Sequence, residues 1–120
     1  MPRTQVHFYM EDGVVPALIW LDETPDNARD KLFYRIKRLE EVGHELRRPE
    51  ADFLRYGIYE LRINRQRVQY RLLYFFFQKE AVIAHGCTKE GEVGVKDIDR
   101  PVARKRRYEK SPEAHRFGSS

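Results

Sequence analysis

Three cations in the second half of the chain could do chemistry together. Arg71 interrupts a stretch that is otherwise apolar as far as Phe77, and a cation in such a strand costs free energy unless a partner neutralises it. Arg62 lies on the preceding predicted strand, and Lys89 ends the following one. Because a guanidinium stays protonated and can grip a phosphate through two hydrogen bonds, these residues could bind a phosphate group.

Each of these positions also has a structural interpretation. Arg71 could form an ion pair with Glu60 on the adjacent strand, which is compatible with a role in phosphate binding, and Arg62 could be a solvated charge. Glu60 could act as a general base, although pairing with an arginine is favoured. His85 could also act as a base because imidazole titrates near neutrality, but its apolar strand favours a hydrogen-bonded structural role.

The distribution of charge favours a polyanionic partner. The 120 residues carry a net charge of +4. Residues 55–71 hold five arginines against Glu60 alone, and residues 96–110 hold seven basic against three acidic groups. Nucleic acid would bind at these two blocks, whereas two solvated faces are the alternative. The candidate RNA contacts are Arg65, Arg67, Lys96, Arg104 and Arg107.

The composition excludes several other classes of protein. The single cysteine, Cys87, cannot form an internal disulfide and fits a reducing cytosol. The four histidines are scattered without the spacing of metal ligands, so neither a metal site nor a cofactor is expected. No apolar stretch approaches the roughly 18 residues of a membrane span, and the N-terminus lacks the pattern of a signal peptide. We therefore expect a cytoplasmic protein without membrane contact.

The elements that must position these residues begin with a strand and a helical hairpin. Residues 4–10 alternate as a strand, and residues 16–21 fit one or two helical turns. A longer helix is predicted from Thr24, as its N-cap, to a stop at Gly43. Its apolar stripe comprises Ala28, Leu32, Ile36 and Leu39, widened by Phe33. Residues 44–57 are polar and predict a connecting loop.

The second half predicts a three-stranded meander and a helix. Residues 58–63 alternate, with Tyr59, Leu61 and Ile63 on one face. Residues 68–78 form a central strand buried on both faces, and residues 81–87 form the third strand. Since proline disrupts a helix interior, the last helix is expected to start near Asp99–Pro101, with a frayed tail over residues 111–120. The fold class is α+β, with one domain over residues 1–110 and a small antiparallel or mixed sheet.

Three short motifs follow one another between residues 57 and 89. Residues 57–62 read GIYELR, Tyr70-Arg71-Leu72 precedes an aromatic run, and residues 85–89 read HGCTK. Their order resembles the RelE/ParE superfamily of toxins, and within it the HigB-like branch related to phage Gp49, whose third motif is H-G-F-x-K. The resemblance covers roughly residues 5–110 and implies a RelE-like fold.

The resemblance also implies an activity and partners. Toxins of this kind belong to type II toxin–antitoxin systems and cut mRNA in the ribosomal A site without a metal. A ribose 2′-OH attacks the adjacent phosphate, and preorganised cations stabilise the charge that develops on its oxygens. By resemblance Arg71 stabilises that phosphate, and Lys89 contacts it or acts as an acid. The implied partners are the ribosome, mRNA and a helix-turn-helix antitoxin of the HigA type.

Three other functions stay open from the sequence. One is a non-catalytic module that binds nucleic acid, since its basic blocks would look the same. Another is a ParE-like inhibitor of DNA gyrase that acts by protein contact. A third is a degenerate toxin that only binds its partner, which Glu90 and Glu92 favour because they replace cations of the family pattern. The motif at residues 85–89 favours the nuclease.

Overall fold

The fold is α+β, as expected, with a six-stranded mixed sheet in the order β2-β3-β4-β5-β1-β6. The computed structural model describes residues 3–89 and 94–118, without the side chain of Lys89. The strands are β1 (Val6–Tyr9), β2 (Ala51–Arg55), β3 (Ile58–Arg65), β4 (Val68–Phe77), β5 (Glu80–Lys89) and β6 (Arg116–Phe117). The helices are α1 (Pro16–Asp22), α2 (Asp26–Val42), the short 3-10 helix η1 (Gly43–Glu45), α3 (Val95–Lys110) and α4 (Pro112–His115).

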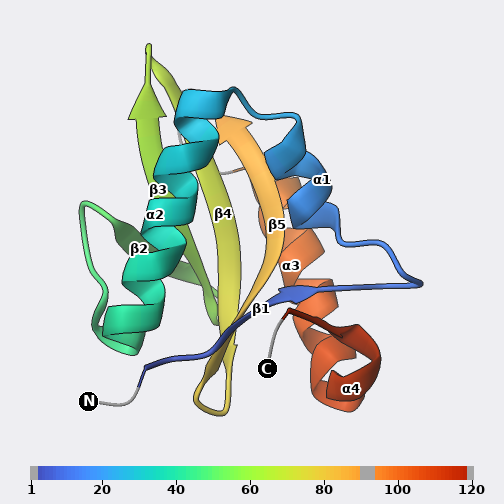
Figure 1. Cartoon of the computed structure of the whole chain (residues 1–120). Helices are drawn as coiled ribbons and strands as arrows, with labels where there is room; N and C mark the ends of the chain where they lie inside the picture. The colour runs from blue at the N-terminus through green and yellow to red at the C-terminus, as the bar shows by residue number, and fades with distance from the viewer. Residues whose placement is uncertain (1–2, 90–93, 119–120) are drawn as a thin grey trace.

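The sheet is the middle layer of three (Figure 1). Helices α1 and α2 cover one face, and α3 lies against the other face behind β4 and β5. Each face has its own core: Leu61 and Leu72 pack under α1 and α2, whereas Leu73 and Phe75 pack with Ile98 and Tyr108 of α3. A side chain on β3, β4 or β5 therefore faces either helices α1 and α2 or helix α3.

The meander β3-β4-β5 is antiparallel, and β1 adds to it in parallel next to β5. The predicted alternation of β3 is confirmed, because Leu61 and Ile63 enter the core under α2 while Glu60 and Arg62 occupy the α3 side. In β4 the residues Leu72–Phe75 are buried, as predicted for a central strand. Arg62 therefore lies on the face of β3 opposite to Leu61 and Ile63, as the alternation predicts.

Several boundaries differ from those expected. The segment predicted as a loop contains β2, which pairs with β3 and forms one edge of the sheet. Helix α2 has Pro25 at its N-cap, while the Thr24 hydroxyl donates to the Trp20 carbonyl instead. The stripe Ala28, Leu32, Ile36 and Leu39 is buried as expected, but Phe33 is 45 % exposed.

Helix α3 begins at Val95, well before the expected start near Asp99. Pro101 lies inside the helix and is buried. It is the seventh helical residue. Because proline has no N–H, it cannot donate the hydrogen bond that another residue would make to the carbonyl four residues earlier, and its ring crowds that carbonyl. The tail, expected to be frayed, contains α4 and β6, and Phe117 of β6 pairs with Phe8 of β1. None of the described helices is long and apolar enough to cross a membrane.

A bulge in β5 changes which side chains face α3. Leu73 of β4 pairs with His85, but its neighbour Tyr74 pairs with Ile83, so Ala84 is the additional residue. Because side chains alternate along a strand, one extra residue reverses the alternation beyond it. Val82 and Ala84 face α3 before the bulge, and Cys87 faces α3 after it. The bulge therefore turns the end of β5 toward the cations of β3 and β4.

Candidate functional site

Two of the predicted cations lie directly opposite each other. Arg62 and Arg71 are a cross-strand pair in the β3–β4 ladder. Arg71 Nη1 lies 3.3 Å from one carboxylate oxygen of Glu60, and Arg62 Nη1 lies 3.6 Å from the other. The side chain of Glu60 is 2 % exposed and that of Arg71 is 6 % exposed, whereas Arg62 is 30 % exposed. The buried Glu60 carboxylate therefore holds the two guanidiniums next to each other, one at each of its oxygens.

These residues line a cavity of about 810 Å³ between the sheet and the start of α3. Its charged lining residues are four arginines and two carboxylates: Arg48, Arg55, Arg62, Arg71, Asp52 and Glu60. The remaining wall comes from β2, β4 and the first turn of α3, namely Phe53, Leu54, Gln69, Gly94, Val95 and Ile98. The cavity carries more positive than negative groups, so it suits an anion.

Two further contacts involve the arginines of the cavity lining. Arg71 Nη2 donates a hydrogen bond to the Gln69 side-chain oxygen, two residues back on β4. Arg48, just before the edge strand β2, donates from Nε and Nη2 to one oxygen of Asp52 on that strand, at 2.9 and 2.7 Å. Burial raises the pKa of the Glu60 carboxyl, although the guanidiniums of Arg71 and Arg62 lower it. Guanidiniums held in place before a ligand arrives are what stabilisation of a phosphate requires.

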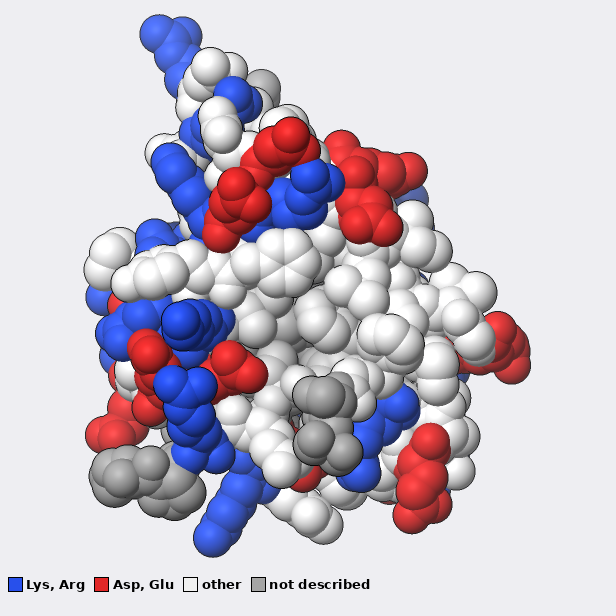
Figure 2. Space-filling model, viewed as in Figure 1, with Lys and Arg blue, Asp and Glu red and all other residues white. Residues whose placement is uncertain are grey.

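The other predicted site residues lie in different places. Lys89 pairs with Gln69 in the β4–β5 ladder, but its side chain is outside the described structure, as are Glu90 and Glu92. Arg65 and Arg67 lie at the tip of the β3–β4 hairpin, where Lys and Arg gather at the top of the view in Figure 2. Lys96 is exposed in the first turn of α3.

Arg104 and Arg107 already have partners elsewhere in the chain. Arg104 Nη1 donates to the Ala84 carbonyl at the β5 bulge, with a distance of 2.6 Å. Arg107 is more than half exposed and its Nη1 lies 3.1 Å from a Glu11 carboxylate oxygen. Tyr108 on the same helix is fully buried and packs edge to face on Phe75. At this end of α3, Tyr108 therefore packs against the sheet, whereas Arg107 is on the surface.

A second group of polar side chains lies between β5 and α3. His85 Nε2 is 3.0 Å from Asp97 Oδ1, so the preference for a hydrogen-bonded His85 is confirmed. Burial lowers the pKa of the His85 imidazole, while the hydrogen bond with Asp97 raises it. Cys87 joins them, and the ligand atoms of the three residues all lie within 4.8 Å of one another. Among the described residues, this is a group that could hold a metal ion.

Sequence reasoning missed Arg48 and Asp52 of the cavity and the group of His85, Cys87 and Asp97. Arg48 and Asp52 lie in the segment predicted as a loop, although the apolar Ala51 and Phe53 on either side of Asp52 were an available strand signal. The approach of Asp97 to His85 and Cys87 depends on the β5 bulge and on the early start of α3. Neither feature leaves a recognisable trace in the sequence.

Comparison with known families agrees with the arrangement of motifs and strands. A search of curated proteins finds no match to this chain. The family model described as phage-derived protein Gp49-like (DUF891) matches residues 19–108, which include β3, β4, β5 and most of α3. Since the match covers most of the chain, the protein belongs to the Gp49-like family, a toxin-like family within the RelE/ParE-like toxin superfamily.

Proposed function

We propose that this chain is the toxin of a type II toxin–antitoxin system and that it cleaves mRNA on the ribosome without a metal. The observation that carries the proposal is the pairing of Arg62 and Arg71 around Glu60 in a cavity open to an anion. Family membership supports the toxin part of the proposal. The nuclease part rests on what the two guanidiniums could do to a phosphodiester.

The proposed reaction is an internal transesterification. The ribose 2′-oxygen loses its proton and bonds to the neighbouring phosphorus, and the bond from phosphorus to the 5′-oxygen breaks. The 5′-oxygen takes up a proton, so the products are a 2′,3′-cyclic phosphate and a 5′-hydroxyl end. Negative charge grows on the non-bridging oxygens, where Arg71 and Arg62 would donate hydrogen bonds. Removing one such donor typically lowers a rate by about 100- to 1000-fold.

Glu60 is a positioning residue in this proposal. It holds both guanidiniums from below, and an incoming phosphate would share them from the open side of the cavity. Lys89, which ends β5, is proposed to contact the same phosphate or to protonate the 5′-oxygen. Arg65, Arg67 and Lys96 are exposed or half-buried at the hairpin tip and the start of α3, and we propose them as contacts to RNA backbone.

We propose Arg104 and Arg107 as further contacts to RNA, although each already has a partner within the chain. Arg104 is half-buried and donates to Ala84, so an RNA contact would have to use its remaining nitrogens. Arg107 would have to exchange its exposed ion pair with Glu11 for a phosphate, which costs little because solvent screens such pairs.

The partners follow from the family. A toxin-like family implies an antitoxin, and we propose one with a helix-turn-helix domain of the HigA type. The ribosome and mRNA are the proposed targets, and the proposed location is the cytoplasm.

The test is expression of the wild type and an Arg71→Gln variant in translating cells, with mapping of mRNA 5′ ends. The wild type should arrest growth and cut inside translated codons, and the variant should do neither. Arg3→Gln is the control, because Arg3 is 64 % exposed and outside the cavity lining. Arrest with intact mRNA and blocked gyrase would replace the proposal with the ParE-like function. Absence of toxicity in the wild type would indicate a degenerate toxin.

A further inference from the structure

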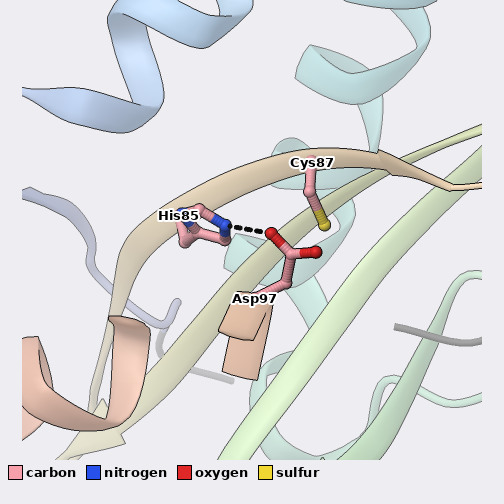
Figure 3. Close-up of side chains that lie close together, drawn as sticks. All are labelled: His85, Cys87 and Asp97. Carbon is pink, nitrogen blue, oxygen red and sulfur yellow. Dashed lines mark hydrogen bonds and ion pairs between the residues drawn. The ribbon is translucent and has the colours of Figure 1, made fainter. Parts of the chain in front are cut away.

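We propose that His85, Cys87 and Asp97 form a zinc-binding site that ties the first turn of α3 to β5. Figure 3 shows the three side chains converging from these two elements, with the Cys87 sulfur pointing toward the Asp97 carboxylate. Their ligand atoms lie within 4.8 Å of one another, and His85 and Cys87 are buried. This inference is independent of the proposed nuclease activity.

The spacing of the ligand atoms is close to that of a zinc site. Zinc binds nitrogen and oxygen at about 2.0–2.2 Å and sulfur at about 2.3 Å, so neighbouring ligand atoms of a tetrahedral site lie roughly 3.3–3.8 Å apart. His85 Nε2 and Asp97 Oδ1 are already 3.0 Å apart, and the sulfur is within 4.8 Å. Movements below about one ångström would complete three corners, and a water molecule would occupy the fourth.

The donor atoms of the three side chains suit zinc. Imidazole and thiolate select Zn²⁺ over Mg²⁺ and Ca²⁺, which prefer oxygen ligands alone. When Cys87 binds as a thiolate, its charge and that of Asp97 together balance the two positive charges of the ion. A neutral cluster is what a buried position between sheet and helix can accept at low cost. The thiol proton is released to solvent on binding.

An irregular feature of the fold brings these three side chains together. The extra residue Ala84 in β5 reverses the alternation of the strand, so that Cys87 faces α3. The start of α3 at Val95 then brings Asp97 within its first turn. Bulges commonly redirect side chains at functional sites. The ion would therefore join two elements, one of which forms a wall of the arginine cavity through Val95 and Ile98.

Metal-free full-length protein should be titrated with Co²⁺ and Zn²⁺ in the absence of RNA. We expect one ion per chain, with a thiolate-to-cobalt charge-transfer band that Zn²⁺ abolishes by displacement. At free zinc about tenfold above the dissociation constant, the unfolding temperature should rise by about 5 °C. Because no RNA is present, failure of this test leaves the nuclease proposal untouched, and failure of the nuclease test leaves this one untouched.

Two ligand variants and one control make the test specific. Cys87→Ser should abolish the charge-transfer band, and both Cys87→Ser and Asp97→Asn should weaken zinc binding by at least about 10- to 100-fold. Circular dichroism of the metal-free variants shows whether they fold, and Asp97→Asn keeps a hydrogen-bonding oxygen for His85. His44→Gln should bind as the wild type does, because His44 is exposed and outside the group. A folded wild type that binds no zinc, or ligand variants that bind it equally well, would overturn the site.

Discussion

Replacing Arg71 by methionine should destabilise the fold by about 3 kcal/mol at pH 7. The pair that this change breaks is buried, with side chains 6 % and 2 % exposed and Arg71 Nη1 3.3 Å from Glu60. Removing one partner of such a pair costs about 3–5 kcal/mol, because a charge is left buried without compensation. The lower end applies here since Arg62 still lies 3.6 Å from the other carboxylate oxygen.

The double variant Glu60→Gln with Arg71→Met tests the reason for this loss. It removes the carboxylate charge together with the guanidinium, so it should recover at least about 1 kcal/mol relative to Arg71→Met alone. Recovery of stability on removing the Glu60 charge would show that the uncompensated buried charge, and not lost packing, is the main cost of Arg71→Met.

The pH dependence supplies a second signature. Burial raises the pKa of Glu60, so the native state binds a proton more readily than the unfolded chain does. The resulting stabilisation is fully present below the unfolded pKa of about 4.3 and is lost as the pH rises through the higher folded value. Arg71→Met removes a cation that lowers this pKa, so its penalty should shrink as the pH falls from about 7 to 5.

Urea unfolding followed by circular dichroism measures these differences, with Arg3→Met as an exposed control that should stay within about 0.5 kcal/mol of the wild type. A decrease of less than about 1 kcal/mol in the free energy of unfolding of Arg71→Met would contradict the cost assigned to the uncompensated Glu60 charge. That cost would also be contradicted if the double variant were no more stable than Arg71→Met, or if the penalty grew on acidification.

Three further changes test the framework around the site. Gly86→Ala should cost about 1–3 kcal/mol, because a Cβ there would lie 2.3 Å from the Trp20 ring. Arg104→Leu should cost about 1–3 kcal/mol, because the Ala84 carbonyl at the bulge loses its donor at 2.6 Å. Arg67→Gly should stabilise the hairpin by up to about 1 kcal/mol, because Arg67 has φ 70°, while weakening any RNA contact at its tip.

Thermal unfolding checks all three changes. Arg106→Leu is the control for Arg104→Leu, since Arg106 is an exposed cation on the same helix and its loss should be nearly neutral. A Gly86→Ala chain as stable as the wild type would contradict the close packing of Trp20. Equal effects at positions 104 and 106 would contradict the bulge contact, and a lower unfolding temperature for Arg67→Gly would contradict the turn argument.

The sequence predicts most of the meander and its cations because local patterns decide them. Alternation along residues 58–63 separates Leu61 from Glu60 and Arg62, and the uninterrupted apolar run identifies β4 as central. The sequence places Arg62 and Arg71 on neighbouring strands, and the pairing register sets them directly opposite each other. Ion pairing of Arg71 with Glu60 follows from the cost of burying either charge alone.

The remaining features depend on tertiary contacts that override local preference. β2 has only five residues and lies in an otherwise polar segment, and it forms a strand by pairing with the edge of β3. Pro101 marks a helix start in sequence statistics, yet packing of Ile98 and Tyr108 against the sheet keeps α3 continuous through it. The group His85, Cys87 and Asp97 requires the β5 bulge, and a one-residue register change is invisible in a short apolar strand.

The most direct test of the central claim is the rate of ribosome-bound mRNA cleavage by Arg62→Gln, Arg71→Gln and the double variant in a purified translation system. If both guanidiniums act on one phosphate, each single change should slow cleavage by about 100-fold or more. The double variant should then be scarcely slower than the worse single one, because residues that act as a unit are not additive. Cleavage by folded Arg71→Gln at the wild-type rate, or losses that simply multiply, would contradict the account.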